Sequence, residues 1–406
     1  MSQQDLNSGS QQPNEATPQL VAHMDDYRAL VKIACLLSSE PDLDNLLNLI
    51  IDTSNSLLNA DRSSLFLIDY ETNELYSKIA LGTLNEIRVK IGSGLAGTVA
   101  KTGEIINLRD AQNDPRQQKR ISSEQAYIPH TMLTVPMRNH SGKIIGVIQT
   151  INKKTGSFNE RDEEVSLAFA SLAAVAIENA TMRRDIELMF KSFIETMADT
   201  IDLKSPQTAG HSRRVAFYAA EISRELNLPK ENIELIRMAG LLHDYGKIGV
   251  PEVVLKKQGR LTEEEWGFMR QHVSITEEIL KRLYLIGELK RLPSITGQHH
   301  ERVNGTGYPN GLLSEAIHLE AKILAVSDVY DALTIRRYYR EPMTHIDALN
   351  YLRTLIGIEF EGECVEALVR VVERVGAPQN PYEDTALQFG STPAETLAPD
   401  LSRFLQ

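Results

Sequence analysis

Histidines and aspartates recur at a regular interval in the second half of the sequence. One helix-turn-helix unit has about the length of this interval, so each site can project from its own helix into one shared interior. Successive sites are 32, 28, 27 and 28 residues apart, and they are His211, the pair His243 and Asp244, His272, the pair His299 and His300, and Asp328. We therefore predict that these seven side chains meet in the interior of a helical bundle. We call these seven residues the metal cluster, for the chemistry that their side chains indicate.

The side-chain types in this set indicate a metal centre without thiolates. Imidazoles and carboxylates suit Fe, Mn or Zn, and the only two cysteines, Cys35 and Cys364, exclude both a disulfide framework and a thiolate cluster. Two metals about 3.5–4 Å apart can lower the pKa of a water and stabilise the attacking and leaving oxygens of phosphoester hydrolysis. Asp244 follows His243 directly, so it could bridge two such metals, and Lys247 could reach a substrate phosphate.

A single histidine on a helix is more often a structural residue than a ligand, and only the joint pattern reverses those odds. His318 and His345 lie outside the pattern, and we expect them at the surface.

Length and composition describe a multidomain globular protein. The chain has 406 residues, 42% apolar content and a net charge of −12, so two or three domains are expected and a nucleic-acid partner is not. The N-terminus is polar, and no signal peptide or membrane span is predicted. We expect a cytoplasmic protein without a membrane partner, in which residues 1–24 are disordered and residues 376–406 form a tail.

Between these ends the pattern of apolar and polar residues changes twice along the chain. Residues 25–161 mix short β-like runs with helical stretches and predict an α+β domain, whereas residues 201–375 read as helices joined by short turns and predict an all-α bundle. Residues 162–200 read as one continuous helix that links the two. The fold class is therefore multidomain.

The linking helix carries a heptad seam. Its apolar or small residues alternate four and three apart, and Asn179 falls on an a position, where a buried amide pair can fix the register of a two-stranded coiled coil. The seam residues are Ala168, Leu172, Val175, Met182, Ile186, Met189 and Phe193. We predict a parallel homodimer through residues 162–200; the alternative is one amphipathic helix that packs on its own domain.

Residues 195–372 resemble the HD-GYP domain, a subgroup of the HD-superfamily phosphohydrolases that hydrolyses the bacterial messenger cyclic di-GMP. The matching blocks, in order, are HSRRVA, LLHDYGKIGVP, LTEEEWGFMRQH, HHERVNGTGYPNGL and AKILAVSDVYDALT. Gly307, Tyr308 and Pro309 correspond to the signature turn that flanks the active site.

The resemblance also implies roles for the ligands. His211, His243, Asp244 and Asp328 would hold one metal, and Asp244, His272, His299 and His300 the second, with iron or manganese as the usual metal. Asp244 and Lys247 would be catalytic: Lys247 would contact the scissile phosphate, and a bridging hydroxide would attack phosphorus to give pGpG and, in a second round, GMP.

Four positions depart from the family pattern. Gln207 replaces a glutamate that helps bind a third metal in some members, so two metals are favoured. Asn304 replaces the aspartate usual in the HHExxDGxGYP block, Tyr338 the proline of an RPYR segment, and Tyr245 a small aliphatic residue.

Residues 25–180 resemble a GAF domain, a small-molecule-binding fold with a sheet covered by helices. The matching stretches are ADRSSLFLID, IGSGLAGTVAKTGEIINLRDAQNDPR, LTVPM and IGVIQTINK. A further set resembles the signature of GAF domains that bind cAMP or cGMP: Asn152, Lys153, Phe158, Asp162 and Glu163. Lys153 and Asp162 could equally form an ion pair that ties the last strand to the linking helix.

By the same resemblance the GAF ligand would contact Ser64, Leu95, Ala96, Gln125 and Gln149. The Thr-Gly-Phe-x-Thr stretch of nucleotide-binding members is replaced by Gln125-Ala126-Tyr127-Ile128-Pro129, so the identity of a nucleotide ligand stays open. A haem-binding GAF domain is a weaker alternative, with His130 and His140 as its candidate axial ligands.

Three functions are consistent with the sequence. The first is a dimeric cyclic di-GMP phosphodiesterase regulated by a small GAF ligand such as cAMP or cGMP. The second is a metal-containing but catalytically weak cyclic di-GMP sensor or scaffold, and the third is a hydrolase of another cyclic dinucleotide.

Overall fold

The computed structural model describes residues 18–77, 86–115, 128–204, 210–335 and 341–375. The chain divides into two compact units, Met1–Ile186 and Glu187–Gln406. Gln125, Gln207 and Tyr338, which the sequence analysis singled out, lie outside the described residues.

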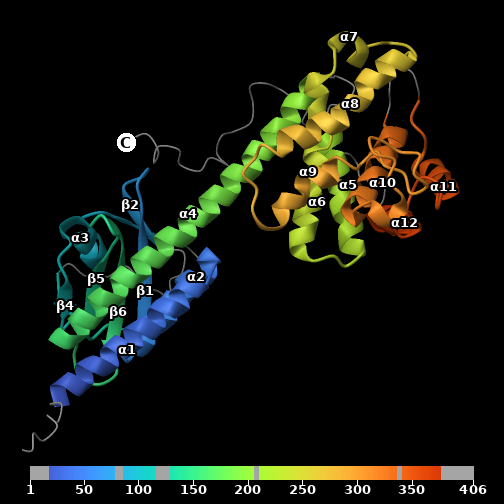
Figure 1. Cartoon of the computed structure of the whole chain (residues 1–406). Helices are drawn as coiled ribbons and strands as arrows, with labels where there is room; N and C mark the ends of the chain where they lie inside the picture. The colour runs from blue at the N-terminus through green and yellow to red at the C-terminus, as the bar shows by residue number, and fades with distance from the viewer. Residues whose placement is uncertain (1–17, 78–85, 116–127, 205–209, 336–340, 376–406) are drawn as a thin grey trace, which may run out of the picture. The chain divides into compact units, whose positions relative to one another are not determined.

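A six-stranded antiparallel sheet forms the centre of the first unit (Figure 1). The strand order is β3-β2-β1-β6-β5-β4. The strands are β1 (Ala60–Asp69), β2 (Glu74–Ser77), β3 (Ile87–Lys90), β4 (Ile106–Leu108), β5 (Met132–Arg138) and β6 (Ile144–Lys153). Together with the helices below, this sheet confirms the predicted α+β domain.

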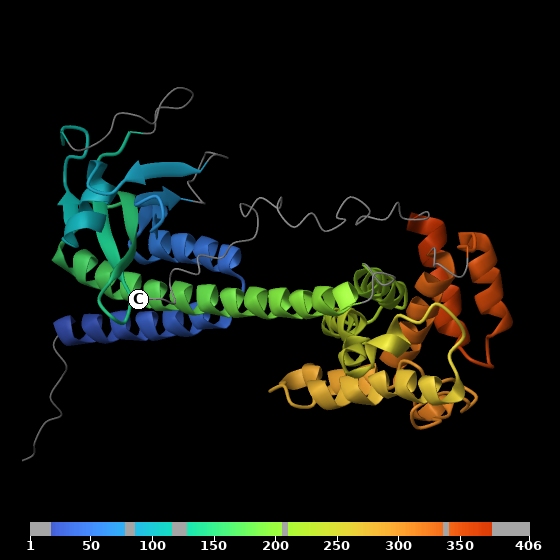
Figure 2. The ribbon, with the colours of Figure 1, turned by 90° about the horizontal axis from the view of Figure 1, so that it is seen from above.

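Helices cover both faces of the sheet. On one face α1 (Pro18–Ser39), α2 (Leu43–Leu57) and the first part of α4 (Glu160–Lys204) pack against inward-facing residues such as Leu65 and Ile148 (Figure 2). The opposite face, which includes Phe66 and Val147, packs against α3 (Gly94–Thr102). Successive strand residues point to opposite faces, so one strand supplies both hydrophobic clusters.

Helix α4 runs without a break for 45 residues, which confirms the helix predicted over 162–200. By length and composition it could cross a membrane, because one window of 18 residues has a mean hydropathy of 1.5, but 44% of that window is buried. Phe169, Ala173 and Ile177 of this stretch lie in the core of the first unit. A core helix of a globular domain gives the same composition.

The second unit is helical, as predicted. Its helices enclose one large hydrophobic cluster, and the described residues of this unit contain only two isolated β-bridges. The α-helices are α5 (His211–Glu225), α6 (Lys230–Leu242), α7 (Glu252–Leu255), α8 (Glu263–Leu280), α9 (Leu292–Thr296), α10 (Leu319–Thr334), α11 (His345–Thr354) and α12 (Gly362–Val375). Three 3-10 helices are η2 (Tyr245–Gly249), η3 (Gly287–Arg291) and η4 (Ser314–Ala316).

Candidate metal centre

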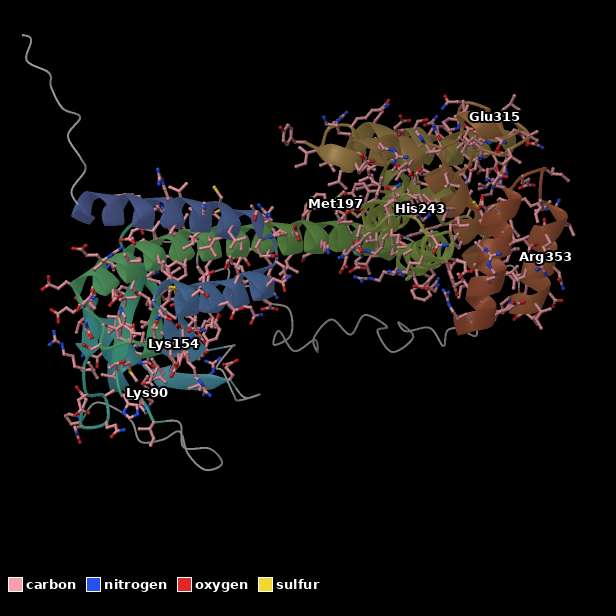
Figure 3. The ribbon with its side chains drawn as sticks, turned by 90° about the horizontal axis from the view of Figure 1, so that it is seen from below. Lys90, Lys154, Met197, His243, Glu315 and Arg353 are labelled. Carbon is pink, nitrogen blue, oxygen red and sulfur yellow. The ribbon has the colours of Figure 1, made fainter. Side chains whose placement is uncertain are left out.

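The helices of the second unit bring all seven residues of the metal cluster together. Figure 3 labels one of them, His243, within the second unit. Each site comes from a different helix or helix end, as the spacing predicts. His211 begins α5, His243 and Asp244 follow α6, His272 lies within α8, His299 and His300 follow α9, and Asp328 lies on α10.

Three overlapping groups in the cluster have candidate ligand atoms within 4.8 Å of one another. The groups are His211, His243 and Asp328; His243, Asp244 and His299; and His272, His299 and His300. Asp244 lies between the group that contains His211 and the group that contains His272. Its Oδ2 is 3.6 Å from His211 Nε2 and 3.4 Å from His243 Nε2, while its Oδ1 is 3.3 Å from His272 Nε2. A carboxylate in this position can contribute one oxygen to each of two metals.

Three of the imidazoles are oriented in the same way by the backbone. Nδ1 of His243, His272 and His299 lies 2.7, 2.6 and 2.6 Å from the carbonyl oxygen three residues earlier in the chain. Nδ1 must therefore donate, and Nε2 carries the lone pair that a metal requires.

The same three Nε2 atoms are buried and make no hydrogen bond to any described residue. A buried nitrogen without a partner is costly. Because these unpartnered nitrogens face two carboxylates, the residues present fit a divalent cation.

For three of the imidazoles and for Asp244, electrostatics favour the ligand-competent protonation states. Burial lowers the pKa of His272 and of His299, and it lowers the pKa of His300 to about 3. Burial alone would raise the pKa of Asp244, but the nearby Lys247 ammonium holds this pKa well below its usual range. Neutral imidazoles and a charged carboxylate are the forms that bind metal.

His211 is oriented by a carboxylate that the sequence analysis missed. Its Nδ1 lies 2.7 Å from Asp331 Oδ2, and Arg214 Nε donates to Asp331 Oδ1 at 2.6 Å. Burial lowers the pKa of His211, but Asp328 and Asp331 outweigh this effect and raise it to about 10 in the absence of a metal. Asp331 lies one helical turn after Asp328, and this spacing is the signal that could have revealed it.

The 3-10 helix η2 holds Asp244 and Lys247 against α8. A Cβ on Gly246 would lie 2.0 Å from the carbonyl oxygen of His272, so only glycine permits the approach, and the Gly246 amide donates to Thr276 Oγ1 at 2.8 Å. Lys247 forms an ion pair with Asp244. At the end of α4, Lys204 Nζ donates to the carbonyl oxygen of Ile248 at 2.7 Å.

The loop after His300 forms one side of the site. Buried Glu301 accepts hydrogen bonds from the backbone amides of Asn310 and Leu312, at 2.7 and 2.8 Å, and so closes the loop. Gly307 lies so close to Arg302 that a Cβ would be 2.3 Å from its backbone nitrogen.

Within this loop Tyr308 stacks on His300, with ring centroids 4.8 Å apart, and Pro309 follows through a cis peptide bond. Asn304 accepts from the amide and hydroxyl of Thr306, so the turn is closed without an aspartate. Tyr245 is half-buried.

Two family models match the chain. The model described as a GAF domain matches residues 42–177, and the model described as an HD domain matches residues 195–360. The chain is a GAF domain followed by an HD domain. The three candidate ligand groups all lie within the part of the chain that the HD model matches.

Three curated relatives illustrate the similarity. The chain is 40% identical over 190 residues to "Cyclic di-GMP phosphodiesterase response regulator RpfG" of Xanthomonas campestris pv. campestris, covering 46% of this chain and 49% of the relative. It is 40% identical over 172 residues to "3'3'-cGAMP-specific phosphodiesterase 3" of Vibrio cholerae, covering 42% and 37%. It is 35% identical over 179 residues to a "Cyclic di-GMP phosphodiesterase" of Thermotoga maritima, covering 43% and 47%. The chain thus spans half or less of the length of these relatives.

Two histidines of the HD domain lie outside the metal cluster, as expected, but neither is a plain surface residue. His318 is half-buried and its Nε2 lies 3.3 Å from Ser294 Oγ. His345 is half-buried and its Nδ1 lies 2.6 Å from the Tyr330 hydroxyl. The sequence does not reveal this burial, because it depends on packing between distant helices.

In the GAF domain, the signature residues connect the last strand to α4. Lys153 of β6 forms an ion pair with Asp162 of α4, as the alternative interpretation of these two residues predicts, and both side chains are largely buried. Asn107 of β4 donates to Glu163 Oε1 at 2.7 Å and to the carbonyl oxygen of Phe158 at 3.1 Å. Asn152 Oδ1 accepts from the backbone amide of His130 at 2.6 Å.

The described GAF residues assigned to ligand binding share one face of the sheet. Ser64 pairs with Gln149, which in turn pairs with Thr134 and donates to its hydroxyl at 3.3 Å. Leu95 and Ala96 of α3 are buried in the hydrophobic cluster of that face. The haem alternative is not favoured, because His130 and His140 are both exposed.

Proposed function

We propose that the HD domain is a cyclic di-GMP phosphodiesterase that opens the messenger to pGpG and, in a second round, yields GMP. The observation that carries this proposal is the set of three buried, unpartnered Nε2 atoms beside Asp244. A centre of this kind suits phosphoester hydrolysis, and the names of two relatives support the substrate.

Two metal ions, iron or manganese, would occupy the cluster. Asp244 would contribute to both, because its two oxygens face different histidines. His211, His243 and Asp328 would complete one site, and His272, His299 and His300 the other.

The metals, when bound, would supply an activated water and positive charge for the phosphate. Lys247 would leave its ion pair with Asp244 to contact the scissile phosphate as a point charge. Hydrolysis would break the bond from phosphorus to the 3′ oxygen and leave the phosphate on the 5′ oxygen of the product. Tyr308, stacked on His300, would limit access of bulk water to this side.

We further propose that the GAF domain regulates hydrolysis by binding a small ligand such as cAMP or cGMP. The signal would pass through α4 in a cytoplasmic homodimer that pairs along the heptad seam, with Asn179 at its centre. Support comes from the exposure of seam residues on the described chain, since Met182, Ile186 and Met189 are 56%, 54% and 56% exposed. The Lys153–Asp162 pair would couple the sheet to α4.

A second candidate substrate is 3′3′-cGAMP, which the name of the Vibrio cholerae relative favours. A catalytically weak sensor of cyclic di-GMP is the remaining alternative. The complete set of candidate ligands argues against it, because binding without turnover does not require every ligand to be kept.

Anaerobic incubation of the manganese- or iron-loaded full-length protein with cyclic di-GMP, followed by chromatography, tests the proposal. We expect pGpG from the wild type, none from Asp244→Ala, and a changed rate when cAMP or cGMP is added. Metal-loaded protein that binds cyclic di-GMP without turnover would favour the sensor instead.

A further inference from the structure

Arg270 lies at the edge of the candidate active site. It is exposed on α8, two residues before His272, and its Cζ lies 5.6 Å from the centroid of the Tyr308 ring. Tyr308 in turn stacks on His300, at 4.8 Å and an interplanar angle of 30°. The Tyr308 ring therefore contacts a predicted metal ligand, His300, and also an exposed guanidinium.

The other cations that surround the centre are engaged within the protein. Lys247 pairs with Asp244, Arg302 with Glu359, and Arg214 with Asp331. Arg270, by contrast, makes no side-chain hydrogen bond or ion pair to any residue in the described part of the chain. None of the described residues accepts from its five N–H donors, and the cation–π contact places the guanidinium over the Tyr308 ring.

This arrangement suits a planar ligand with acceptors at its edge. An arginine stacked on a ring presents its donors around its own plane, and guanine offers the O6 and N7 acceptors that such a fork binds in bidentate fashion. Adenine offers N7 but places an amino donor where guanine has O6. Trp266, one helical turn before Arg270 on the same face of α8, is 41% exposed, and an exposed aromatic ring can stack on a base.

We propose that Arg270, held over Tyr308, binds the guanine of one half of the cyclic dinucleotide while the scissile phosphate lies at the metal cluster. This inference rests on the proposed phosphodiesterase function. A single subsite that binds guanine accepts cyclic di-GMP in two equivalent orientations, because that messenger has two guanines. It accepts 3′3′-cGAMP, which has one guanine, in only one orientation. The mixed messenger should then be cut at one of its two linkages, and cyclic di-AMP should be a poor substrate.

The test is the position of cleavage in 3′3′-cGAMP. Manganese-loaded full-length protein is incubated with it, and the two linear products, pApG and pGpA, are separated by chromatography. We expect the wild type to form one isomer in roughly tenfold excess or more, since a bidentate base contact discriminates by about that factor. Position of cleavage is informative because a purely structural role of Arg270 would change the rate but not the isomer ratio.

Three variants complete the experiment. Arg270→Ala should form both isomers in comparable amounts, and Arg270→Lys should resemble it, because lysine keeps the charge but lacks the planar fork. Arg282→Ala is the matched control: it removes an exposed arginine just beyond the end of α8 and should keep the wild-type ratio.

A mixture of isomers from the wild type, an unchanged ratio in Arg270→Ala, or cleavage of cyclic di-GMP without cleavage of 3′3′-cGAMP would overturn the role of Arg270. An equal loss of rate for all substrates in Arg270→Ala, with the isomer ratio kept, would show a phosphate contact and would also overturn it. Absence of cleavage of both messengers by the wild type would instead contradict the proposed function itself.

Discussion

Three imidazoles of the metal cluster are each oriented by a separate hydrogen bond to the backbone. His243, His272 and His299 each use Nδ1 on a carbonyl three residues earlier, which leaves Nε2 for a ligand. Such orientation before metal binding reduces the entropy that binding must overcome. The cluster is therefore organised by local helix geometry as much as by tertiary packing.

Removal of one such imidazole should remove one metal. We expect His272→Ala to lower the bound manganese from two ions per chain to one and to reduce hydrolysis by more than about 100-fold, since even outer-shell partners are worth 10–100-fold. Elemental analysis of the purified protein measures the metal. His318→Ala, which changes a half-buried histidine outside the cluster, should keep both ions; an equal metal loss in the two variants would argue against a specific role.

Asp331 should act through His211 rather than on the metal directly. Asp331→Asn keeps the size of the side chain but removes the charge that Arg214 and His211 contact. We expect a metal affinity weaker by roughly 10–100-fold, measured by competition with a chelator. The exposed carboxylate Glu315 serves as a control through Glu315→Gln, and an affinity in Asp331→Asn equal to that control would refute the positioning role.

At the scale of elements, the close approach of η2 to α8 sets the position of Asp244 and Lys247. A methyl group on Gly246 would overlap the backbone of His272, so we expect Gly246→Ala to destabilise the HD domain by roughly 1–3 kcal/mol. Gly267→Ala, within α8 but with no atom within 4 Å of the added methyl, should stabilise it by about 0.5–1 kcal/mol. Thermal unfolding followed by circular dichroism compares the two, and equal shifts would contradict the packing argument.

Much of the element-level description could be predicted from the sequence. The spacing of His211, His243 and His272 predicts one ligand per helix, and the heptad seam predicts the long α4, because both depend on local periodicity. The roles of Asp331 and Glu301, and the contact of Lys204 with η2, could not be predicted, since they depend on where distant elements meet. Burial of His318 and His345 escaped prediction for the same reason.

For the whole molecule, the exposed seam of α4 is the proposed dimer contact. Ile186→Asp places a charge at an a position and should give a monomer, because a buried unpaired charge is costly. Lys191→Asp, at the exposed f position on the opposite side of the helix, should remain dimeric. Sedimentation velocity distinguishes the two species, and a dimer that survives Ile186→Asp would place the contact elsewhere.

The central claim is that two metals in the cluster drive hydrolysis of a cyclic dinucleotide. Its most direct test is a titration of the metal-free full-length protein with manganese under anaerobic conditions while cyclic di-GMP hydrolysis is followed. Hydrolysis is predicted to appear with the metal and to reach its maximum near two equivalents per chain. Hydrolysis that is already complete without metal, or that stays absent when two ions are bound, would contradict the account.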